Sequence, residues 1–505
     1  MKSNKENKVL LSKILIFLKP YIKKISVIFL CIFASSVISI IIPLFSKKIM
    51  DEGLLMHNFF LIVRYTIVIF VFVLIDQIIG LLEIKYYSYI NAMFQFSLNK
   101  VAFKHLLKLK VTYFNKVNFS EIISNIGVDV GNITRICDGG TFIIISQVFR
   151  IFGGIIGLSL IDWKLTLLVI TIVPLRYIIV RALAKKRKGL IKEFIEFNRD
   201  FSSWYGDTIC GIREIKLWGI DRIKIGEFIK KQRKIIKINI KMAFLDKLNE
   251  YSETLLFHII NSTLYILGSS IVFSNGTSIR GLFAFLTYSS YVIGPISLIL
   301  NIGYNFSNIV PSAKRYLDFL DIETEINEQQ LKPIRTSNLQ VKGKINFENI
   351  IFAYNDEVNL LSDISFEINC GEKAAIIGIN GSGKTTLINL LLRFYNSQQG
   401  KILLDGIDIR QIKLKDYRNL ISVFSQELYL FNESIEHNIN LYSKSDQLKV
   451  HKAAEESRAY EFIQNMPLKY NTQVGSGGSN LSGGQRQNVA MARALIRDSK
   501  NINFR

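Results

Sequence analysis

The chain has 505 residues, of which 49% are hydrophobic and 21% charged, and its mean hydropathy is +0.26. This composition excludes a purely soluble protein, because so apolar a chain must place part of its length in lipid. The formal net charge of +22 does not indicate nucleic-acid binding, since Lys and Arg gather between long apolar runs, as in cytoplasmic segments of membrane proteins.

Six apolar stretches are long enough to cross about 30 Å of hydrocarbon at about 1.5 Å per residue. They lie near 25–46, 59–82, 139–161, 163–183, 254–275 and 280–303. Long basic segments follow the second and fourth stretches, whereas the other links are short. Because basic segments stay on the cytoplasmic side, we expect an all-α six-helix transmembrane domain in the plasma membrane, with both termini in the cytoplasm.

The character of the sequence changes near residue 310, where a charged segment without a membrane-length apolar run begins. After it, short β-branched runs alternate with helical patterns, which is typical of a soluble α/β domain. We therefore predict a multi-domain chain with a transmembrane domain at 1–310, a linker at 311–342 and an α/β domain at 343–505. The four cysteines, Cys31, Cys137, Cys210 and Cys370, form no CxxC pair, so no zinc or redox centre is expected.

Residues 373–392, KAAIIGINGSGKTTLINLLL, predict a buried strand, a glycine-rich turn and an amphipathic helix. The pattern GxxxxGK followed by Thr runs from Gly378 to Thr385 and is typical of a phosphate-binding loop. Its backbone N–H groups bind phosphates, Lys384 neutralises the β- and γ-phosphates, and the Thr385 hydroxyl binds Mg²⁺. The predicted ATP site comprises Gly378, Asn380, Gly381, Ser382, Gly383, Lys384, Thr385 and Thr386.

A second motif, LSGGQ, opens another predicted helix and consists of Leu481, Ser482, Gly483, Gly484 and Gln485. A phosphate loop followed by LSGGQ, with six spans ahead of it, resembles the exporter type of the ATP-binding cassette (ABC) transporters. The resemblance implies that LSGGQ of one chain closes over ATP held by the phosphate loop of a second chain. A Ser hydroxyl and glycine N–H groups at a helix N-terminus suit such an anion-binding face.

The resemblance also assigns roles to single residues. Tyr354 in the strand IIFAYND is expected to stack on adenine, with an ordinary strand tyrosine as the alternative. Gln426 matches a catalytic glutamine that meets Mg²⁺ and the attacking water, with a surface glutamine as the alternative. Ser476 stands where such exporters often carry Glu next to the coupling contacts.

Three ionisable residues, Asp76, Arg150 and Arg176, lie among apolar neighbours within the predicted spans. Such residues usually face a cavity or a partner, so they are candidates for the substrate cavity. If Arg150 and Arg176 are unpaired there, they favour anionic or amphipathic cargo. The alternative is a structural Asp–Arg pair.

The resembled family continues after LSGGQ into a buried strand ending in Asp-Glu, called Walker B, and then into a histidine. Here the only acidic residue after Gln485 is Asp498, and the sequence ends KNINFR. We therefore expect no strand at this end, a nucleotide-binding domain that is incomplete at its C-terminus, and no ATP hydrolysis by the chain as written. A one-base slip in an A-rich codon run at Lys500 would account for this ending.

The leading hypothesis is an exporter subunit that couples ATP binding and hydrolysis to export of a peptide, lipid or drug-like compound. It would work as a homodimer or heterodimer with a second half-transporter in the lipid bilayer, and without nucleic acid. The alternative is a hydrolysis-deficient half-transporter that binds ATP and supplies LSGGQ to a complete partner. A third hypothesis is a membrane channel with a regulatory nucleotide domain.

Overall fold

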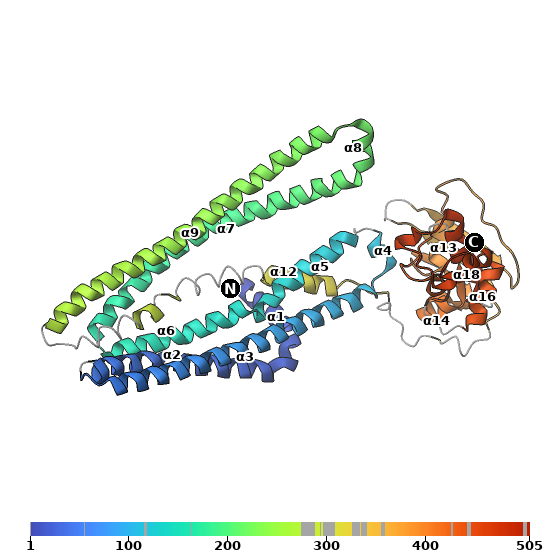
Figure 1. Cartoon of the computed structure of the whole chain (residues 1–505). Coiled ribbons are helices and arrows are strands. Elements are labelled where there is room, and N and C mark those ends of the chain that lie inside the picture. Colours follow the sequence, from blue (N-terminus) through green and yellow to red (C-terminus); the bar gives the residue numbers. More distant parts are fainter. Residues whose placement is uncertain are drawn as a thin grey trace. The chain divides into compact units, whose positions relative to one another are not determined.

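A computed structural model describes residues 2–54, 56–115, 119–161, 163–273, 288–292, 294–295, 309–325, 334, 341–354, 359–425, 428–441, 446–497 and 502–504. The chain divides into two compact units (Figure 1). Unit 1 comprises Met1–Leu106 and Phe119–Ile322, and unit 2 comprises Leu107–Asn118 and Glu323–Arg505. The assignment of residues 107–118 to the second unit was not predicted from the sequence.

Unit 1 is helical. Its main helices are α1 (Lys2–Leu15), α2 (Ile22–Lys48), α3 (Phe59–Leu106), α5 (Phe119–Thr134), α6 (Gly139–Ile161), α7 (Trp163–Cys210), α8 (Ile212–Trp218), α9 (Asp221–Phe273) and α12 (Ile309–Leu320). Within the described residues, three segments have the length and hydropathy to cross a membrane, namely Val9–Leu54, Phe59–Leu106 and Ile122–Ser159. They contain the first two predicted spans, 25–46 and 59–82, and residues 139–159 of the third. The predicted span 280–303 lies mostly outside the described residues, so the count of six stays a prediction.

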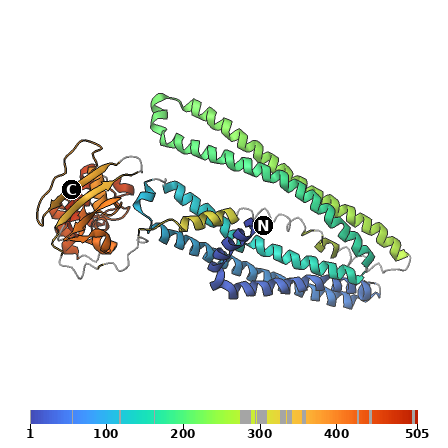
Figure 2. The same cartoon turned by 180° about the vertical axis from the view of Figure 1, so that it is seen from behind.

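Two sets of helices make up unit 1 (Figures 1 and 2). Helices α2, α3 and α6 run side by side, and α12 packs between α1 and α5. Helices α7 and α9 form a long antiparallel hairpin with α8 at its tip. Apolar residues such as Phe70 and Leu81 on α3 are exposed, as suits helices that face lipid.

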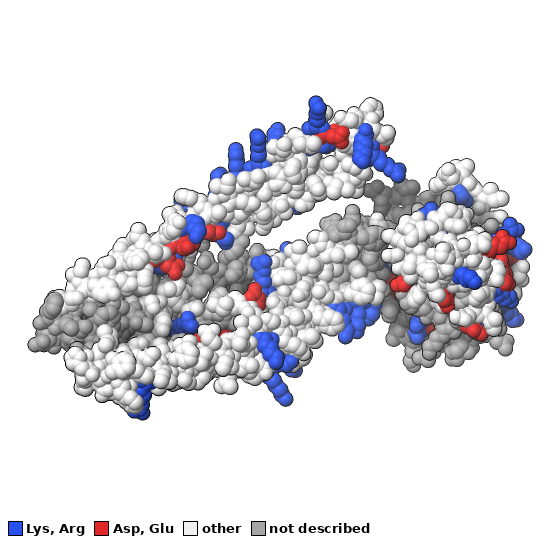
Figure 3. Space-filling model, in the orientation of Figure 1, with Lys and Arg blue, Asp and Glu red and all other residues white. Residues whose placement is uncertain are grey.

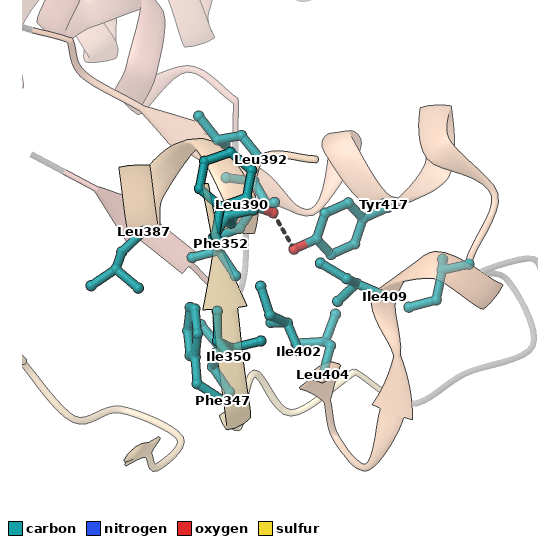
Figure 4. Close-up of a cluster of buried hydrophobic side chains, with 14 of the residues drawn as sticks. Phe347, Ile350, Phe352, Leu387, Leu390, Leu392, Ile402, Leu404, Ile409 and Tyr417 are labelled. Carbon is teal, nitrogen blue, oxygen red and sulfur yellow. Dashed lines mark hydrogen bonds between the residues drawn. The ribbon is translucent and has the colours of Figure 1, made fainter. Parts of the chain in front are cut away.

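Unit 2 is built around a four-stranded antiparallel sheet of β1 (Ile345–Phe352), β2 (Leu361–Ile368), β3 (Gln399–Leu404) and β4 (Ile407–Asp408), in the order β2-β1-β3-β4. Side chains of β1 and β3 pack against α13 (Lys384–Leu391) and α14 (Leu414–Asn419), as Figure 4 shows. The Tyr417 hydroxyl in this core donates a hydrogen bond of 2.6 Å to the Leu391 carbonyl oxygen. The core fixes the start of α13, which follows the phosphate loop.

A second hydrophobic cluster of unit 2 holds the helix that carries LSGGQ. It contains α15 (Ile435–Asn440), α16 (Gln447–Glu456), α17 (Tyr460–Gln464) and α18 (Gly483–Leu495). Leu481, the first residue of the motif, is buried in this cluster and anchors it.

The buried strand predicted at 373–379 is wrong. Residues 372–379 have no regular secondary structure, and the side chains of Ile377 and Ile379 are 92% and 83% exposed. A strand depends on hydrogen bonds to its neighbours, and neither sheet within the described residues pairs with this segment. An apolar run alone therefore did not decide its conformation.

The prediction that the last residues form no strand is also wrong. Ile502–Phe504 forms β6, which pairs in parallel with β5 (Ile421–Val423) and places Ile502 opposite Ile421. An Ile-Asn-Phe sequence alternates apolar and polar residues, which is the pattern of a short strand.

Candidate nucleotide-binding site

The phosphate loop, Gly378–Thr385, is a tight turn directly before α13. Gly381 and Gly383 have φ angles of +83° and +90°, in the left-handed region that residues with a Cβ rarely adopt. A Cβ on Gly378 would lie 2.7 Å from the Ser382 hydroxyl oxygen and would fill the space inside the loop. The residues present therefore fit a loop that admits a phosphate group, with the first free N–H groups of α13 beside it.

Lys384 begins α13, and its ammonium group bends back over the loop. It donates hydrogen bonds to the carbonyl oxygens of Gly378 and Ile379, at 2.8 and 2.7 Å. Neutral carbonyls are weaker partners for an ammonium group than a phosphate is. The Lys384 ammonium group is thus held where it could bind a nucleotide phosphate in the loop in place of these carbonyl oxygens.

The Tyr354 hydroxyl lies 3.0 Å from the Thr386 hydroxyl, so Tyr354 lies beside this loop, and its stacking on adenine stays a prediction. The rings of Phe352 and Tyr395 both meet the Tyr354 ring edge-on, with centroids 5.0 Å away in each case. These contacts fix the orientation of Tyr354, whose side chain remains 47% exposed. An aromatic ring with a fixed orientation and an exposed face is suited to stacking on a planar base.

A short helix that lies between the membrane helices α3 and α5 in the sequence also contacts this site. Helix α4 (Val111–Phe114) lies in unit 2, and Asn115 after it donates a hydrogen bond of 3.1 Å to the Tyr395 hydroxyl. An ion pair of 2.9 Å joins Lys110 to Glu323. Sequence reasoning missed Tyr395 and Asn115, because single aromatic and amide residues outside a motif give no signal.

The LSGGQ motif forms a capped helix start. The Ser482 hydroxyl accepts a hydrogen bond from the Gln485 backbone N–H at 3.3 Å, and the Gln485 side chain accepts one from the Ser482 N–H at 2.9 Å. A Cβ on Gly483 or Gly484 would meet nothing within 4 Å, so this backbone faces open space. An exposed, capped helix N-terminus of this kind favours an anion.

Arg493 ties the far end of α18 to the segment that follows Gln426. Its guanidinium donates hydrogen bonds to Tyr429 O at 2.8 Å and to Asn438 O and Oδ1 at 2.7 and 2.9 Å. Burial lowers the pKa of Arg493 from its usual value, and these oxygens favour the charged form. Gln426 itself lies outside the described residues.

We expect Ser482→Ala to loosen α18 because it removes the capping hydroxyl. The loss of a helix cap costs about 1 kcal/mol, so amide hydrogen exchange in the first turns of α18 should become about fivefold faster. Ser482→Asn keeps an N-capping oxygen and should exchange like the unmodified chain. Equal exchange in all three proteins would show that the cap does not hold this helix.

Arg176 is not the unpaired cation in a cavity that was predicted from the sequence. It is 1% exposed, and its guanidinium lies 2.8 Å from the Glu253 carboxylate and 2.7 Å from the Ser252 hydroxyl. The prediction for this residue is wrong because an isolated guanidinium in an apolar interior is too costly. Its partner is Glu253 on α9 and not an aspartate. Asp76 accepts a hydrogen bond from Ser35, and the cavity role of Asp76 and Arg150 stays a prediction.

A phosphate loop, a capped LSGGQ helix and membrane-length helices in one chain define a membrane protein with a nucleotide-binding domain. Comparisons with known families agree. The family described as ABC transporter transmembrane region matches residues 25–296, and the ABC transporter family matches residues 361–502. The chain therefore belongs to the ABC transporter family, as a fused exporter half-transporter.

Individual relatives and a solved structure support this assignment. The chain is 28% identical to the ABC transporter ATP-binding protein exp8 of Streptococcus pneumoniae, over 99% of the chain and 85% of that protein. It is 30% identical to an ATP-dependent lipid A-core flippase of Desulfotalea psychrophila, over 79% of the chain and 69% of that protein. A bacterial Atm1-family ABC exporter with ATP bound shares the fold, with a TM-score of 0.80 and 21% identity over 95% of this chain and 86% of that one.

Proposed function

We propose that the chain couples ATP binding and hydrolysis to the export of an amphipathic, lipid-like compound across the cytoplasmic membrane. The observation that carries the proposal is the series of contacts Thr386–Tyr354–Tyr395–Asn115. It runs from the phosphate loop to α4, which the sequence places between the membrane helices α3 and α5. Nucleotide binding at the loop can thereby bias the position of membrane helices.

The proposed roles of the site residues follow from their chemistry. Lys384 and the loop N–H groups bind the phosphates, and Tyr354 stacks on the base. The Thr385 hydroxyl and Gln426 would hold Mg²⁺, which supplies charge neutralisation at the phosphates when bound. Gln426 would also orient the attacking water. The proposed domains remain 1–310, a linker at 311–342, and 343–505.

The proposed topology is a multi-pass chain with both termini in the cytoplasm. Figure 3 shows Lys and Arg gathered on the distal half of the α7–α9 hairpin, towards α8. Basic residues beyond an apolar stretch stay on the cytoplasmic side, which supports this orientation. The cargo class is supported by the name of the flippase relatives, which act on lipid A-core.

We also propose that the partner is a second half-transporter, identical or different. Leu217 and Trp218 at the end of α8 are both 77% exposed, although they are large apolar side chains. Exposed apolar residues at the tip of a long hairpin are suited to contact another chain. A dimer also brings the LSGGQ face of one chain to the phosphate loop of the other.

We expect Trp218 to become protected when two chains associate. In a Trp163→Phe, Trp204→Phe variant, Trp218 is the only fluorescent tryptophan. Its quenching by acrylamide should fall at least about twofold as protein concentration crosses the dimer dissociation constant, because an interface core excludes solvent. A Trp163→Phe, Trp218→Phe variant, which reports on Trp204, is the control and should not change. Unchanged quenching of Trp218 would contradict this contact.

ATP turnover in lipid tests the proposed function against the expectation, made from the sequence alone, that the chain as written does not hydrolyse ATP. The chain reconstituted in vesicles should release phosphate from ATP, vanadate should inhibit the release, and an amphipathic cargo should stimulate it. Ion flux without ATP turnover would instead support the channel hypothesis. Lys384→Ala is the inactive control.

A further inference from the structure

A guanidinium group of α14 holds the C-terminal end of α13. Arg418 donates hydrogen bonds from Nε to the Leu392 carbonyl oxygen at 3.2 Å and from Nη2 to the Arg393 carbonyl oxygen at 3.0 Å. Tyr417, the residue before it, donates its hydrogen bond to the Leu391 carbonyl oxygen of the same turn (Figure 4). A cation is favoured at this place because the carbonyl oxygens at the end of a helix carry a partial negative charge.

The same guanidinium forms an ion pair with Glu325, which follows α12 in the sequence. Its Nη1 and Nη2 atoms donate hydrogen bonds to the two carboxylate oxygens at 3.0 and 3.2 Å. The side chains of Arg418 and Glu325 are only 27% and 19% exposed. A bidentate pair with this little exposure fixes the orientation of both groups and is weakly screened by salt.

Glu325 is also joined to the segment that follows α3. Its backbone N–H donates a hydrogen bond of 2.8 Å to the Lys108 carbonyl oxygen, and the neighbouring Thr324 forms a β-bridge with Leu109. The bridge is buried, since Leu109 and Thr324 are 3% and 8% exposed. All of these residues belong to unit 2. The Arg418 guanidinium therefore connects the end of α13 to the two chain segments that lead to α3 and α12.

The phosphate loop lies at the opposite end of α13. This helix begins at Lys384 and has eight residues, so it is about 12 Å long. Leu387 and Leu390 on one of its faces are packed in the hydrophobic core of unit 2. So short and well packed a helix moves as one body, and a displacement of its first turn also displaces the carbonyl oxygens that Arg418 binds.

We propose that Glu325 and Arg418 form a joint through which a nucleotide at the phosphate loop acts on the segments that lead to α3 and α12. Bound phosphate fixes α13, α13 fixes Arg418, and Arg418 fixes Glu325 together with Lys108. Both members of the pair act through α13, as positioning residues. The inference rests on the proposed function, because it takes the phosphate loop as the nucleotide site. It adds a second route to the one through Tyr395 and Asn115.

Amide hydrogen exchange tests this joint directly. The full chain in lipid nanodiscs is compared with and without a saturating non-hydrolysable ATP analogue, so that no turnover is needed. We expect the analogue to slow exchange in residues 107–110 and 323–325 at least about fivefold, as two coupled sites do. In Glu325→Gln the slowing should fall below about twofold, because a neutral carboxamide does not form the ion pair with Arg418.

The ratio of exchange rates with and without the analogue separates this role from a structural one. A pair that only stabilises the fold would raise both rates equally in Glu325→Gln and leave their ratio unchanged. The double variant Glu325→Gln, Arg418→Gln should respond like Glu325→Gln alone, since both changes break one connection. Unchanged exchange in β1 and β3 without the analogue shows that each variant is folded.

Glu367→Gln is the matched control. It breaks another ion pair of unit 2, in which the Lys344 ammonium lies 2.7 Å from the Glu367 carboxylate, and this pair lies on β2 and not at α13. The variant should keep the full response to the analogue. An equal loss of response in Glu367→Gln and Glu325→Gln would overturn the proposal, because any broken ion pair would then have the same effect.

Two further outcomes would overturn the inference: an unmodified chain that binds the analogue without slower exchange in the two segments, or a full response in Glu325→Gln. A chain that binds no analogue would reject the phosphate-loop assignment and this inference with it. A chain that shows the expected response but does not hydrolyse ATP would support the joint and contradict only the proposed function.

Discussion

Lys384→Ala is expected to weaken ATP binding by at least about a hundredfold, or about 3 kcal/mol, while the chain still inserts into membranes. The ammonium group is the positive charge placed over the phosphate loop, where carbonyl oxygens hold it. The helices of unit 1 do not depend on it. Binding of a fluorescent ATP analogue to the purified chain measures the effect.

Lys373→Ala is the matched control, since it removes an exposed lysine that precedes the loop. It should bind the analogue like the unmodified chain. A Lys384→Ala chain with an unchanged dissociation constant would contradict the assignment of the loop. Loss of membrane insertion in the same variant would show a general folding defect instead.

Glu253→Gln is expected to destabilise the α7–α9 hairpin by about 3 kcal/mol. The substitution removes the charge of Glu253 beside the guanidinium of Arg176, which is 1% exposed. Two other partners of Arg176, the Ser252 hydroxyl and the Asn249 carbonyl oxygen, are neutral and compensate only in part. Unfolding in mixed detergent and dodecyl sulfate micelles measures the change.

The same hairpin offers a control pair in Arg187 and Asp246, with 2.6 Å between nitrogen and oxygen. Both side chains are partly exposed, so Asp246→Asn should cost at most about 1 kcal/mol. Equal destabilisation by Glu253→Gln and Asp246→Asn would show that burial does not set the strength of the Arg176 pair.

The turn of the phosphate loop and the helix start at LSGGQ could be predicted because their geometry is local. Glycine φ angles, a helix start and a capping box depend on residues within a few positions of each other. The family assignment followed from the same two motifs and from the apolar stretches before them. Tyr354 contacts Thr386 of the loop, and its predicted stacking on adenine stays a prediction.

The errors concern contacts between residues that are far apart in sequence. Arg176 and Glu253 are 77 positions apart, and Asn115 and Tyr395 are 280 positions apart. No pattern within a helix or a loop reveals such a partner. The strand predicted at 373–379 failed for a related reason, because an apolar run forms a strand only where another strand is available to pair with it.

The central claim is that ATP at the phosphate loop drives an amphiphile across the membrane. Its most direct test is transport of a fluorescent amphiphile into inverted vesicles that contain the purified chain, with ATP, with a non-hydrolysable analogue, and with Lys384→Ala. We predict that the amphiphile accumulates only when ATP and the unmodified chain are both present. Equal accumulation with the analogue or with Lys384→Ala would contradict the account.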